Sequence, residues 1–348
     1  MSRTNPRSST DSPASDGTRT GAADLNTAVP ALRGEWSTAF PEPPRDSAAV
    51  PAEDLSSMNR RRTDRNAGTL VLIGGASTPR GEALGAFLQR SGGLEGRKIV
   101  GITTASQDPL TSAREWAEAF ASAGAENVEI PIIDQRDRAQ SQQVADMILG
   151  AGGIFLGGGD QVHLVATLGG SRVERAIRQA YSRGATICGT SAGAAALPET
   201  ILAGGEPNAY GQMADLHLGP GFGLLGFRTV IDTHFTQRRR LQRLFMVIAQ
   251  NPELMGLGID EDTAMVVRGH LCEVVGRGSV PVVDGRGVRW DNADECMRGK
   301  ALTLSSLRVG IVGAGYTFNL RERELEVLVQ ENAHPHEMEI VRSQRAAD

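Results

Sequence analysis

The stretch SRVERAIRQAYSRGATICGTSAG, residues 171–193, decides the fold. Residues 171–185 have the pattern of a helix, and residues 186–193 form a short apolar run that ends in small residues, as buried strands do. Ser191 stands among those small residues, directly after the apolar run. The stretch therefore predicts a helix followed by a strand, with a serine at the carboxyl end of the strand.

Strands and helices alternate in the same way from Thr69 onward. The predicted strands are 69–77, 97–106, 127–134 and 153–161, and the predicted helices between them are 82–93, 110–125 and 141–152. Such alternation is typical of parallel βαβ units in a buried sheet. Ligands of such sheets bind beyond the carboxyl ends of the strands, where this sequence has glycines: Gly74 and Gly75, residues 157–159, and Gly189.

The order loosens after Ser191. We expect a long glycine-rich loop at 207–225, a strand at 228–235, a helix from about Arg239, and two strands within 254–267 that are broken at an acidic run. Residues 270–276 and 280–285 are predicted to be hairpin strands. The predicted fold class is therefore α/β, with a mostly parallel central sheet flanked by helices and an antiparallel C-terminal extension.

Both ends of the chain differ in composition from its centre. Residues 1–66 are polar and rich in proline, and such a segment buries too little apolar surface to offset the entropy of ordering. We expect a disordered arm at 1–66, an α/β domain at 67–325 and a tail at 326–348. The basic cluster 58–68 is predicted to be a solvated linker, and the HPHE segment of the tail to be exposed rather than metal-binding.

The composition argues against several classes of function. The net charge is −5 and aromatic residues are few, so we expect no nucleic-acid partner, because such binding needs a basic surface. The three cysteines show neither a zinc spacing nor a disulfide framework, which favours the cytoplasm, and Cys188 is predicted to be a small buried hydrophobe. We expect no membrane span and no export signal, since no apolar run has the necessary length. We also expect no metal and no cofactor.

The segment GTSAG around Ser191 fits G-x-S-x-G, a pattern that exposes a serine on a sharp strand-to-helix turn. Alone the pattern is weak, because small residues also let a strand and a helix pack closely. A nucleophilic serine needs a base and an orienting acid, and both His234 and Glu261 follow predicted strands. The order Ser, His, acid disfavours an α/β-hydrolase, in which the acid precedes the histidine.

Arginines cluster after His234. Arg240 and Arg243 are i, i+3 neighbours on a predicted amphipathic helix, and Arg238 lies at or before its start. The apolar stripe of this helix is Leu241, Leu244, Phe245 and Ile248. The cluster is typical either of a site that binds an anionic group or of a solvated basic face.

Glycines 157–159 open another predicted helix. No Lys-[Ser/Thr] pair follows them, so they do not form a Walker A loop, and nucleotide binding is a weak alternative. The other interpretation is that their backbone N–H groups complete an oxyanion hole that faces Ser191.

Taken in order, the segments LIGGA, FLGGGDQ, GTSAGA, GFGLL, DTHFTQRRRLQRL and GIDEDTA resemble the cyanophycinase family. The resemblance covers about residues 70–276, with a weaker likeness to about residue 320. It implies a fold similar to class I glutamine amidotransferases and a serine peptidase of the peptidase E-like group. The implied substrate is cyanophycin, a polyaspartate with arginine on each β-carboxyl, and the implied product is the β-Asp-Arg dipeptide.

The resemblance also implies roles for single residues. It makes Ser191 the nucleophile, His234 the general base and Glu261 the acid that orients the base. Backbone N–H groups of Gly158 and Ala192 are expected to hold the oxyanion. The residues expected to bind substrate are Gln161, Asp232, Thr233, Arg238, Arg240 and Arg243. Enzymes of this kind are typically homodimers.

The sequence departs from the family pattern at two positions that are expected to line the substrate groove. Thr233 stands where the family usually has Gln, and Ser77 stands where it usually has an acidic residue. The natural substrate is therefore either cyanophycin or another aspartyl peptide. The alternatives are an aspartyl or isoaspartyl dipeptidase similar to peptidase E, an inactive protein that binds acidic or arginine-rich peptides, and a nucleotide-binding module.

Overall fold

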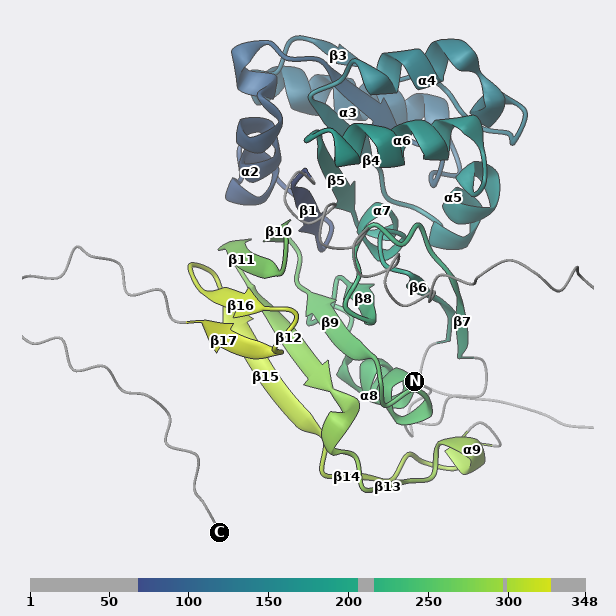
Figure 1. Cartoon of the computed structure of the whole chain (residues 1–348), viewed down its shortest axis with the longest axis vertical. Helices are drawn as coiled ribbons and strands as arrows, with labels where there is room; N and C mark the ends of the chain where they lie inside the picture. The colour runs from purple at the N-terminus through teal and green to yellow at the C-terminus, as the bar shows by residue number, and fades with distance from the viewer. Residues whose placement is uncertain (1–67, 206–215, 297–298, 327–348) are drawn as a thin grey trace, which may run out of the picture. The chain divides into compact units, whose positions relative to one another are not determined.

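The computed structural model describes residues 68–205, 216–296 and 299–326 (Figure 1). Within these ranges the chain forms one large mixed sheet, a four-stranded sheet and two small antiparallel pairs. The predicted limits of the arm at 1–66 and of the tail at 326–348 fall at or beyond the edges of the described ranges. The predicted domain limits therefore stay predictions.

The parallel half of the large sheet follows the predicted alternation. From the centre outward its strands are β1 (Leu70–Ile73), β5 (Thr186–Thr190), β4 (Gly153–Leu156), β2 (Ile99–Ile102) and β3 (Val128–Glu129), and neighbours pair in parallel. The connecting helices are α2 (Glu82–Ser91), α3 (Pro109–Ser122), α4 (Gln142–Leu149), α5 (Gln161–Leu168) and α6 (Arg172–Ser182). The predicted α/β class with a mostly parallel core is confirmed.

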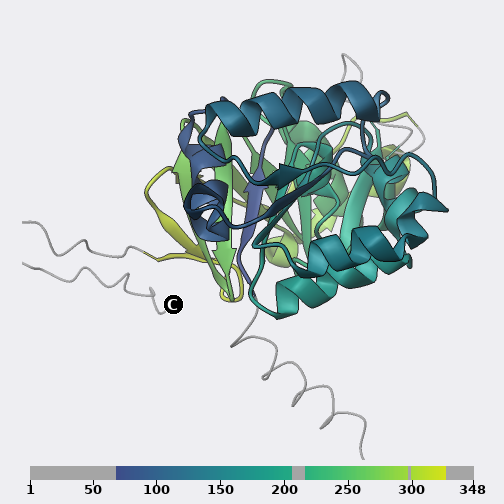
Figure 2. The same ribbon diagram turned by 90° about the horizontal axis from the view of Figure 1, so that it is seen from above.

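Helices lie on both sides of these strands (Figure 2). Phe87 of α2 and Phe120 of α3 pack against Phe155 of β4 in one cluster. Ile177 of α6 belongs to the other cluster with Ile154, the neighbour of Phe155 along β4. Successive strand residues point to opposite faces, so both faces of the strand are buried. This is why the sequence of each strand is a continuous apolar run rather than an alternating one.

The C-terminal part forms mostly antiparallel strands, as predicted, but divides them between two sheets. The strands β10 (Thr263–Arg268), β11 (Leu271–Gly276), β16 (Thr317–Asn319) and β17 (Glu324–Glu326) extend the large sheet beyond β1. The four-stranded sheet contains β8 (Thr229–Thr233), β9 (Met255–Ile259), β12 (Ser279–Asp284) and β15 (Arg308–Gly313). Helix α8 (Leu241–Gln250) packs against this second sheet through an apolar cluster.

The remaining elements are short. They are the strands β6 (Thr200–Gly204), β7 (His217–Pro220), β13 (Trp290–Asp291) and β14 (Leu304–Ser305), the helices α7 (Ala192–Ala195) and α9 (Ala293–Cys296), and 3-10 turns at Gly93–Glu95, Arg138–Gln140 and Gly285–Gly287. β6 and β7 pair with each other, so part of the predicted loop at 207–225 is a strand. His217 accordingly begins β7, and its prediction as a loop residue was wrong.

Three other local predictions were wrong. Segments 270–276 and 280–285 do not pair with each other, because β11 pairs with β10 and β16 while β12 pairs with β9 and β15. Segment 127–134 yields only the two-residue β3, and Pro131, which cannot donate to a ladder, follows closely. Leu241 is 41% exposed because it is the first residue of α8, whereas Leu244 and Ile248 of the same predicted stripe are buried.

The two sheets meet at the carboxyl end of β1. The Gly74 amide donates to Thr263 O, and Gly74 O accepts from the His234 amide. A Cβ at Gly74 would lie 2.0 Å from Asp260 O, so only glycine lets the backbones approach this closely. The approach brings together the ends of β5, β8 and β9. As a result Ser191, which follows a strand of one sheet, faces residues that follow strands of the other.

Asp284 is a buried carboxylate at the carboxyl end of β12, and it joins the turn after β12 to the turn after β16. Asp284 accepts hydrogen bonds from Arg286 Nε at 2.9 Å and from Arg323 Nη1 at 2.6 Å. Burial by itself raises the pKa of Asp284, but the bonds from Arg286 and Arg323 outweigh burial and hold the pKa below its usual value. The ionised form therefore stabilises the fold above the unfolded pKa of about 4, and this stability is lost as the pH falls through the folded pKa.

We expect Asp284→Asn to lower the free energy of unfolding by about 1–3 kcal/mol at neutral pH, since the hydrogen bonds to a charged acceptor are weakened. Below the unfolded pKa of about 4 the carboxyl of the unfolded chain takes up a proton while the folded form stays ionised, so the difference should shrink as the pH falls toward the folded pKa. Urea unfolding of both proteins at neutral pH and at about pH 3 measures this. An equal difference at the two pH values would contradict the assignment.

Candidate active site

Ser191 stands on a strained turn between β5 and α7. Its φ of 51° and ψ of −117° lie outside the regions that non-glycine residues prefer. The Ser191 amide donates to Ile73 O of β1 at 2.9 Å, which fixes the turn to the neighbouring strand. A Cβ at Gly189 would lie 2.4 Å from Gly193 O, and one at Gly193 would lie 2.2 Å from Leu156 O. The small residues around Ser191 thus let the strand, the turn and the helix pack together while the serine stays accessible.

The three residues predicted from strand ends lie in hydrogen-bond contact. Ser191 Oγ is 2.9 Å from His234 Nε2, and His234 Nδ1 is 2.7 Å from Glu261 Oε1. His234 directly follows β8, and Glu261 follows β9 with one residue between, so two parallel neighbouring strands present the imidazole and the carboxylate. The imidazole is 13% exposed. The arrangement is that of a nucleophile, a base and an orienting acid.

Gly75 supports the imidazole, and sequence reasoning did not assign it this role. A Cβ at residue 75 would lie 2.3 Å from Cε1 and 2.4 Å from Nε2 of His234. The φ of Gly75 is +104°, which L side chains rarely adopt. His234 itself has a φ of 50°, and its amide is held by Gly74 O at 2.8 Å. The two glycines that follow β1 were the available signal in the sequence.

The structure places both expected oxyanion donors beside Ser191. Ala192 follows it in the chain, and a Cβ at Gly158 would lie 3.2 Å from Ser191 Cβ and 3.7 Å from Ser191 Oγ. Among the described residues, the amides of Gly158 and Ala192 donate to no backbone or side-chain acceptor. They are therefore available to a negatively charged oxygen that forms at this position.

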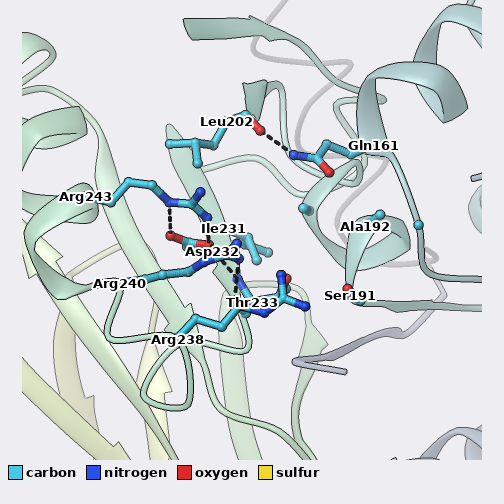
Figure 3. A pocket seen from close by; sticks show the side chains of 12 residues that line it. Gln161, Ser191, Ala192, Leu202, Ile231, Asp232, Thr233, Arg238, Arg240 and Arg243 are labelled. Carbon is cyan, nitrogen blue, oxygen red and sulfur yellow. Dashed lines mark hydrogen bonds and ion pairs between the residues drawn. The ribbon is translucent and has the colours of Figure 1, made fainter. Parts of the chain in front are cut away.

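A polar pocket opens beside Ser191 (Figure 3). Its volume is about 80 Å³, and every residue predicted to bind substrate lines it: Gln161, Asp232, Thr233, Arg238, Arg240 and Arg243. Gln161 Nε2 donates to Leu202 O at 2.6 Å, which leaves the amide oxygen of Gln161 for another group. Ser77, which was also expected in the groove, is not among the lining residues, and its Oγ is buried without a hydrogen-bond partner in the described structure.

Asp232 is the acceptor for two of the three arginines. Its carboxylate is 2% exposed and accepts from Arg243 Nε at 2.8 Å and from Arg240 Nη1 at 3.1 Å. Arg240 Nη1 also donates to Thr233 O, and Arg243 Nη1 donates to Gly205 O. The expected contact between Asp232 and the substrate stays a prediction. In the structure Asp232 holds the guanidinium groups of Arg240 and Arg243 in place.

Arg238 differs from the other two arginines of the pocket. It is exposed, and its guanidinium has no hydrogen bond or ion pair with any residue that the structure describes. Among the described residues, three guanidinium groups and one carboxylate line the pocket, so the charge of this part of the lining is positive. Such a lining is suited to a substrate that carries carboxylates.

The described residues contain no group of three or more His, Cys, Asp or Glu side chains that could hold a metal ion. Cys188 is fully buried within β5, as predicted, and burial raises the pKa of its thiol. No helix in the described part of the chain is long and apolar enough to cross a bilayer.

Residues 70–275 match the model of peptidase family S51. The chain belongs to this family. The S51 match begins at β1 and ends in β11, so it includes Ser191, His234, Glu261 and the whole pocket.

Curated relatives are similar over most of the chain. A protein named cyanophycinase from Synechococcus elongatus is 35% identical over 264 residues, which are 74% of this chain and 81% of the relative. A cyanophycinase from Trichormus variabilis is 33% identical over 278 residues, which are 79% of this chain and 93% of the relative. The predicted membership of the cyanophycinase and peptidase E group is confirmed at the level of the family.

A solved structure supports the fold. A peptidase from an acI-B1 actinobacterium aligns with a TM-score of 0.51 and 22% sequence identity, covering 73% of this chain and 97% of that one. At this identity the likeness concerns the fold alone. Membership of family S51 makes the chain a hydrolase of the peptidase class.

Proposed function

We propose that this S51 peptidase cleaves cyanophycin to β-Asp-Arg dipeptides, with Ser191 as nucleophile, His234 as general base and Glu261 as orienting acid. The observation that carries the proposal is the chain of contacts from Ser191 Oγ through His234 to Glu261, beside a pocket lined by three arginines. The relatives that bear the name cyanophycinase support the choice of substrate.

The proposed reaction has two steps. Ser191 Oγ attacks an aspartyl carbonyl carbon while His234 Nε2 takes the hydroxyl proton, and Glu261 stabilises the imidazolium at Nδ1. The C–N bond breaks, the amine leaves with the proton from His234, and an acyl-enzyme ester stays on Ser191. Water then adds to the ester while His234 takes its proton, the C–O bond to Ser191 breaks, and His234 returns the proton to Ser191 Oγ as the acid product leaves. The amides of Gly158 and Ala192 hold the oxyanion in both steps.

The lining of the pocket supports a substrate chain that carries free carboxylates. Arg238 is the guanidinium without a protein partner among the described residues, so it can bind a substrate carboxylate without breaking an existing bond. Asp232 pairs with both Arg240 and Arg243, which line the same pocket. Gln161 can accept a hydrogen bond from substrate with its amide oxygen, because its amide nitrogen is fixed on Leu202 O.

We expect Arg238→Gln to raise KM for cyanophycin by about 10-fold to 100-fold, as loss of a charged hydrogen bond does, with a smaller change in kcat. The matched control is Arg239→Gln, which removes the same charge from an exposed neighbour that does not line the pocket. Steady-state kinetics on the soluble form of the polymer measures both. Equal KM values for the two variants would contradict a role of Arg238 in binding.

A comparison of substrates tests the proposed function. Cyanophycin, a β-Asp-Arg dipeptide and a short isoaspartyl dipeptide without arginine are each incubated with the protein, and products are quantified by mass spectrometry. The proposal predicts release of β-Asp-Arg from the polymer, with slower or no cleavage of both dipeptides. Cleavage of isoaspartyl dipeptides with the polymer intact would indicate a dipeptidase similar to peptidase E. Binding of the polymer without any cleavage would indicate an inactive peptide-binding homologue.

Two further expectations accompany this function. We propose a homodimer in the cytoplasm, on the basis of the family resemblance and the three unpaired cysteines. Sedimentation measures the first of these directly. No cofactor is invoked in any step, because the serine, the imidazole and the backbone amides supply the nucleophile, the base and the electrostatic stabilisation.

A further inference from the structure

Asp260 is a buried acid next to the active site that the proposed reaction does not use. It lies between the end of β9 and Glu261, and it is 6% exposed. It does not line the pocket beside Ser191. A buried carboxylate is costly unless it is hydrogen-bonded, so its partners indicate what it does.

The two carboxylate oxygens of Asp260 bond to different segments. Oδ1 accepts from the Thr236 amide at 3.0 Å, two residues after His234. Oδ2 accepts from the amide and the hydroxyl of Ser279 at the start of β12, both at 3.1 Å. The Asp260 amide also donates to Ser279 O. A Cβ at Gly278 would lie 2.8 Å from Asp260 Cβ, so the neighbouring glycine leaves room for this contact.

A second bond runs in the opposite direction between the same two loops. The Glu261 amide donates to Gln237 Oε1 at 3.1 Å. Thus Asp260 binds Thr236, which lies two residues after His234. In return, Gln237 binds Glu261, the residue that follows Asp260. We call these two bonds the reciprocal clamp, formed by Thr236 with Asp260 and by Gln237 with Glu261.

The reciprocal clamp joins the segments that carry the imidazole and the carboxylate. His234 has a φ of 50°, a conformation that costs a few kcal/mol and persists only where the surroundings hold it. Three successive amides hold it: His234 N on Gly74 O, Phe235 N on Ile259 O, and Thr236 N on Asp260 Oδ1. Of these acceptors only Asp260 is a side chain, and a charged acceptor makes the stronger hydrogen bond.

We propose that Asp260 is a positioning residue, which acts through the reciprocal clamp to keep the His234 imidazole between Ser191 and Glu261. The inference rests on the proposed roles of Ser191, His234 and Glu261. Without the clamp the turn after β8 can relax toward ordinary φ values, and the imidazole then leaves the line between the hydroxyl and the carboxylate. Displacement of a reacting group by about 1 Å can cost about 100-fold in rate.

The test compares Asp260→Ala with Asp260→Asn. Alanine removes every acceptor, so kcat on cyanophycin should fall about 100-fold, while KM should stay within about threefold because Asp260 does not line the pocket. Asparagine keeps one oxygen that can accept from the Thr236 amide, so it should recover about tenfold of that loss. Gln237→Ala, an exposed position, removes the other half of the clamp and should lower kcat by about tenfold with KM unchanged.

Asp284→Asn is the matched control for stability. It weakens another buried and hydrogen-bonded carboxylate, one whose contacts are with Arg286 and Arg323 and which is not in contact with Ser191, His234 or Glu261. We expect this control to lower the unfolding temperature and leave kcat unchanged. A kcat within twofold of wild type in both Asp260→Ala and Gln237→Ala would overturn the proposal. So would an equal loss of kcat in Asp284→Asn, since the effect would then follow stability alone.

A second readout separates this inference from the proposed substrate. A fluorophosphonate reacts with an activated serine whether or not cyanophycin is the substrate, and its rate depends on the base. Asp260→Ala should slow labelling of Ser191 by about 100-fold, and Asp260→Asn should restore part of the rate. If the wild-type protein does not cleave cyanophycin and the labelling rates still fall from wild type through Asp260→Asn to Asp260→Ala, the proposed substrate is wrong and the role of Asp260 is supported. Equal labelling rates in wild type and Asp260→Ala would overturn the positioning role.

Discussion

Ser191→Ala should reduce release of β-Asp-Arg from cyanophycin by about 10,000-fold or more, because among the described residues only Ser191 places a hydroxyl against the His234 imidazole. The contacts of the serine explain the size of the effect. Its Oγ lies 2.9 Å from His234 Nε2, and the strained turn between β5 and α7 presents it to the pocket. The expected residual rate comes from the oxyanion donors and from binding alone.

Quantified product release under saturating polymer measures this, with Ser182→Ala as a control for loss of a serine hydroxyl at the end of α6. Glu261→Gln should cost less than Ser191→Ala, because the acid only orients and stabilises the imidazole. The alanine variant should keep its affinity for the polymer, since Arg238 and the rest of the pocket are intact. Undiminished turnover by Ser191→Ala would remove the nucleophile from the proposal.

Gly75→Ala should lower kcat by about 100-fold or more, although residue 75 contributes no group to the reaction. The added Cβ would lie 2.3 Å from the Cε1 of His234, well inside contact distance, so the imidazole must move away from Ser191. The φ of +104° adds backbone strain of about 1–2 kcal/mol for any L side chain. Both effects act next to Gly74, whose carbonyl oxygen accepts from the His234 amide.

Gly96→Ala separates the two effects. Gly96 has a φ of +82° and open space where its Cβ would be, so the substitution adds strain without a collision. We expect both variants to unfold at lower temperature and only Gly75→Ala to lose turnover. Steady-state kinetics and thermal unfolding on the same preparations make the comparison. A similar loss of kcat in both variants, or in neither, would show that the imidazole does not depend on Gly75.

Local pattern predicted most of the parallel half of the fold, because β1, β2, β4 and β5 lie in short, mainly apolar runs that are each followed by a helix. The strands β1 and β5 lie within the predicted strands 69–77 and 186–193. Prediction failed for the strands β11 and β12, which were expected to pair as a hairpin and belong to different sheets. Strand pairing depends on long-range packing, and the short connection between two strands does not determine their sheet.

In the candidate site, too, local pattern predicted some features and long-range packing determined the others. Ser191, His234 and Glu261 could be placed because each follows a strand, and the carboxyl ends of these strands meet in space. The contacts of Asp232 could not be predicted, because its pairing with Arg240 and Arg243 depends on how α8 starts after β8. Gly75, Asp260 and Gln237 were also missed, because no motif marks them. The role of Gly75 comes from the approach of two sheets, and those of Asp260 and Gln237 come from bonds between the loops that follow β8 and β9.

Covalent labelling of the wild-type protein tests the central claim most directly. The protein is treated with a fluorophosphonate, digested and mapped by mass spectrometry, with and without excess cyanophycin. One adduct is expected, on the peptide that carries Ser191, with slower labelling when the polymer is present. No adduct, or an adduct elsewhere with Ser191 unmodified, would contradict it.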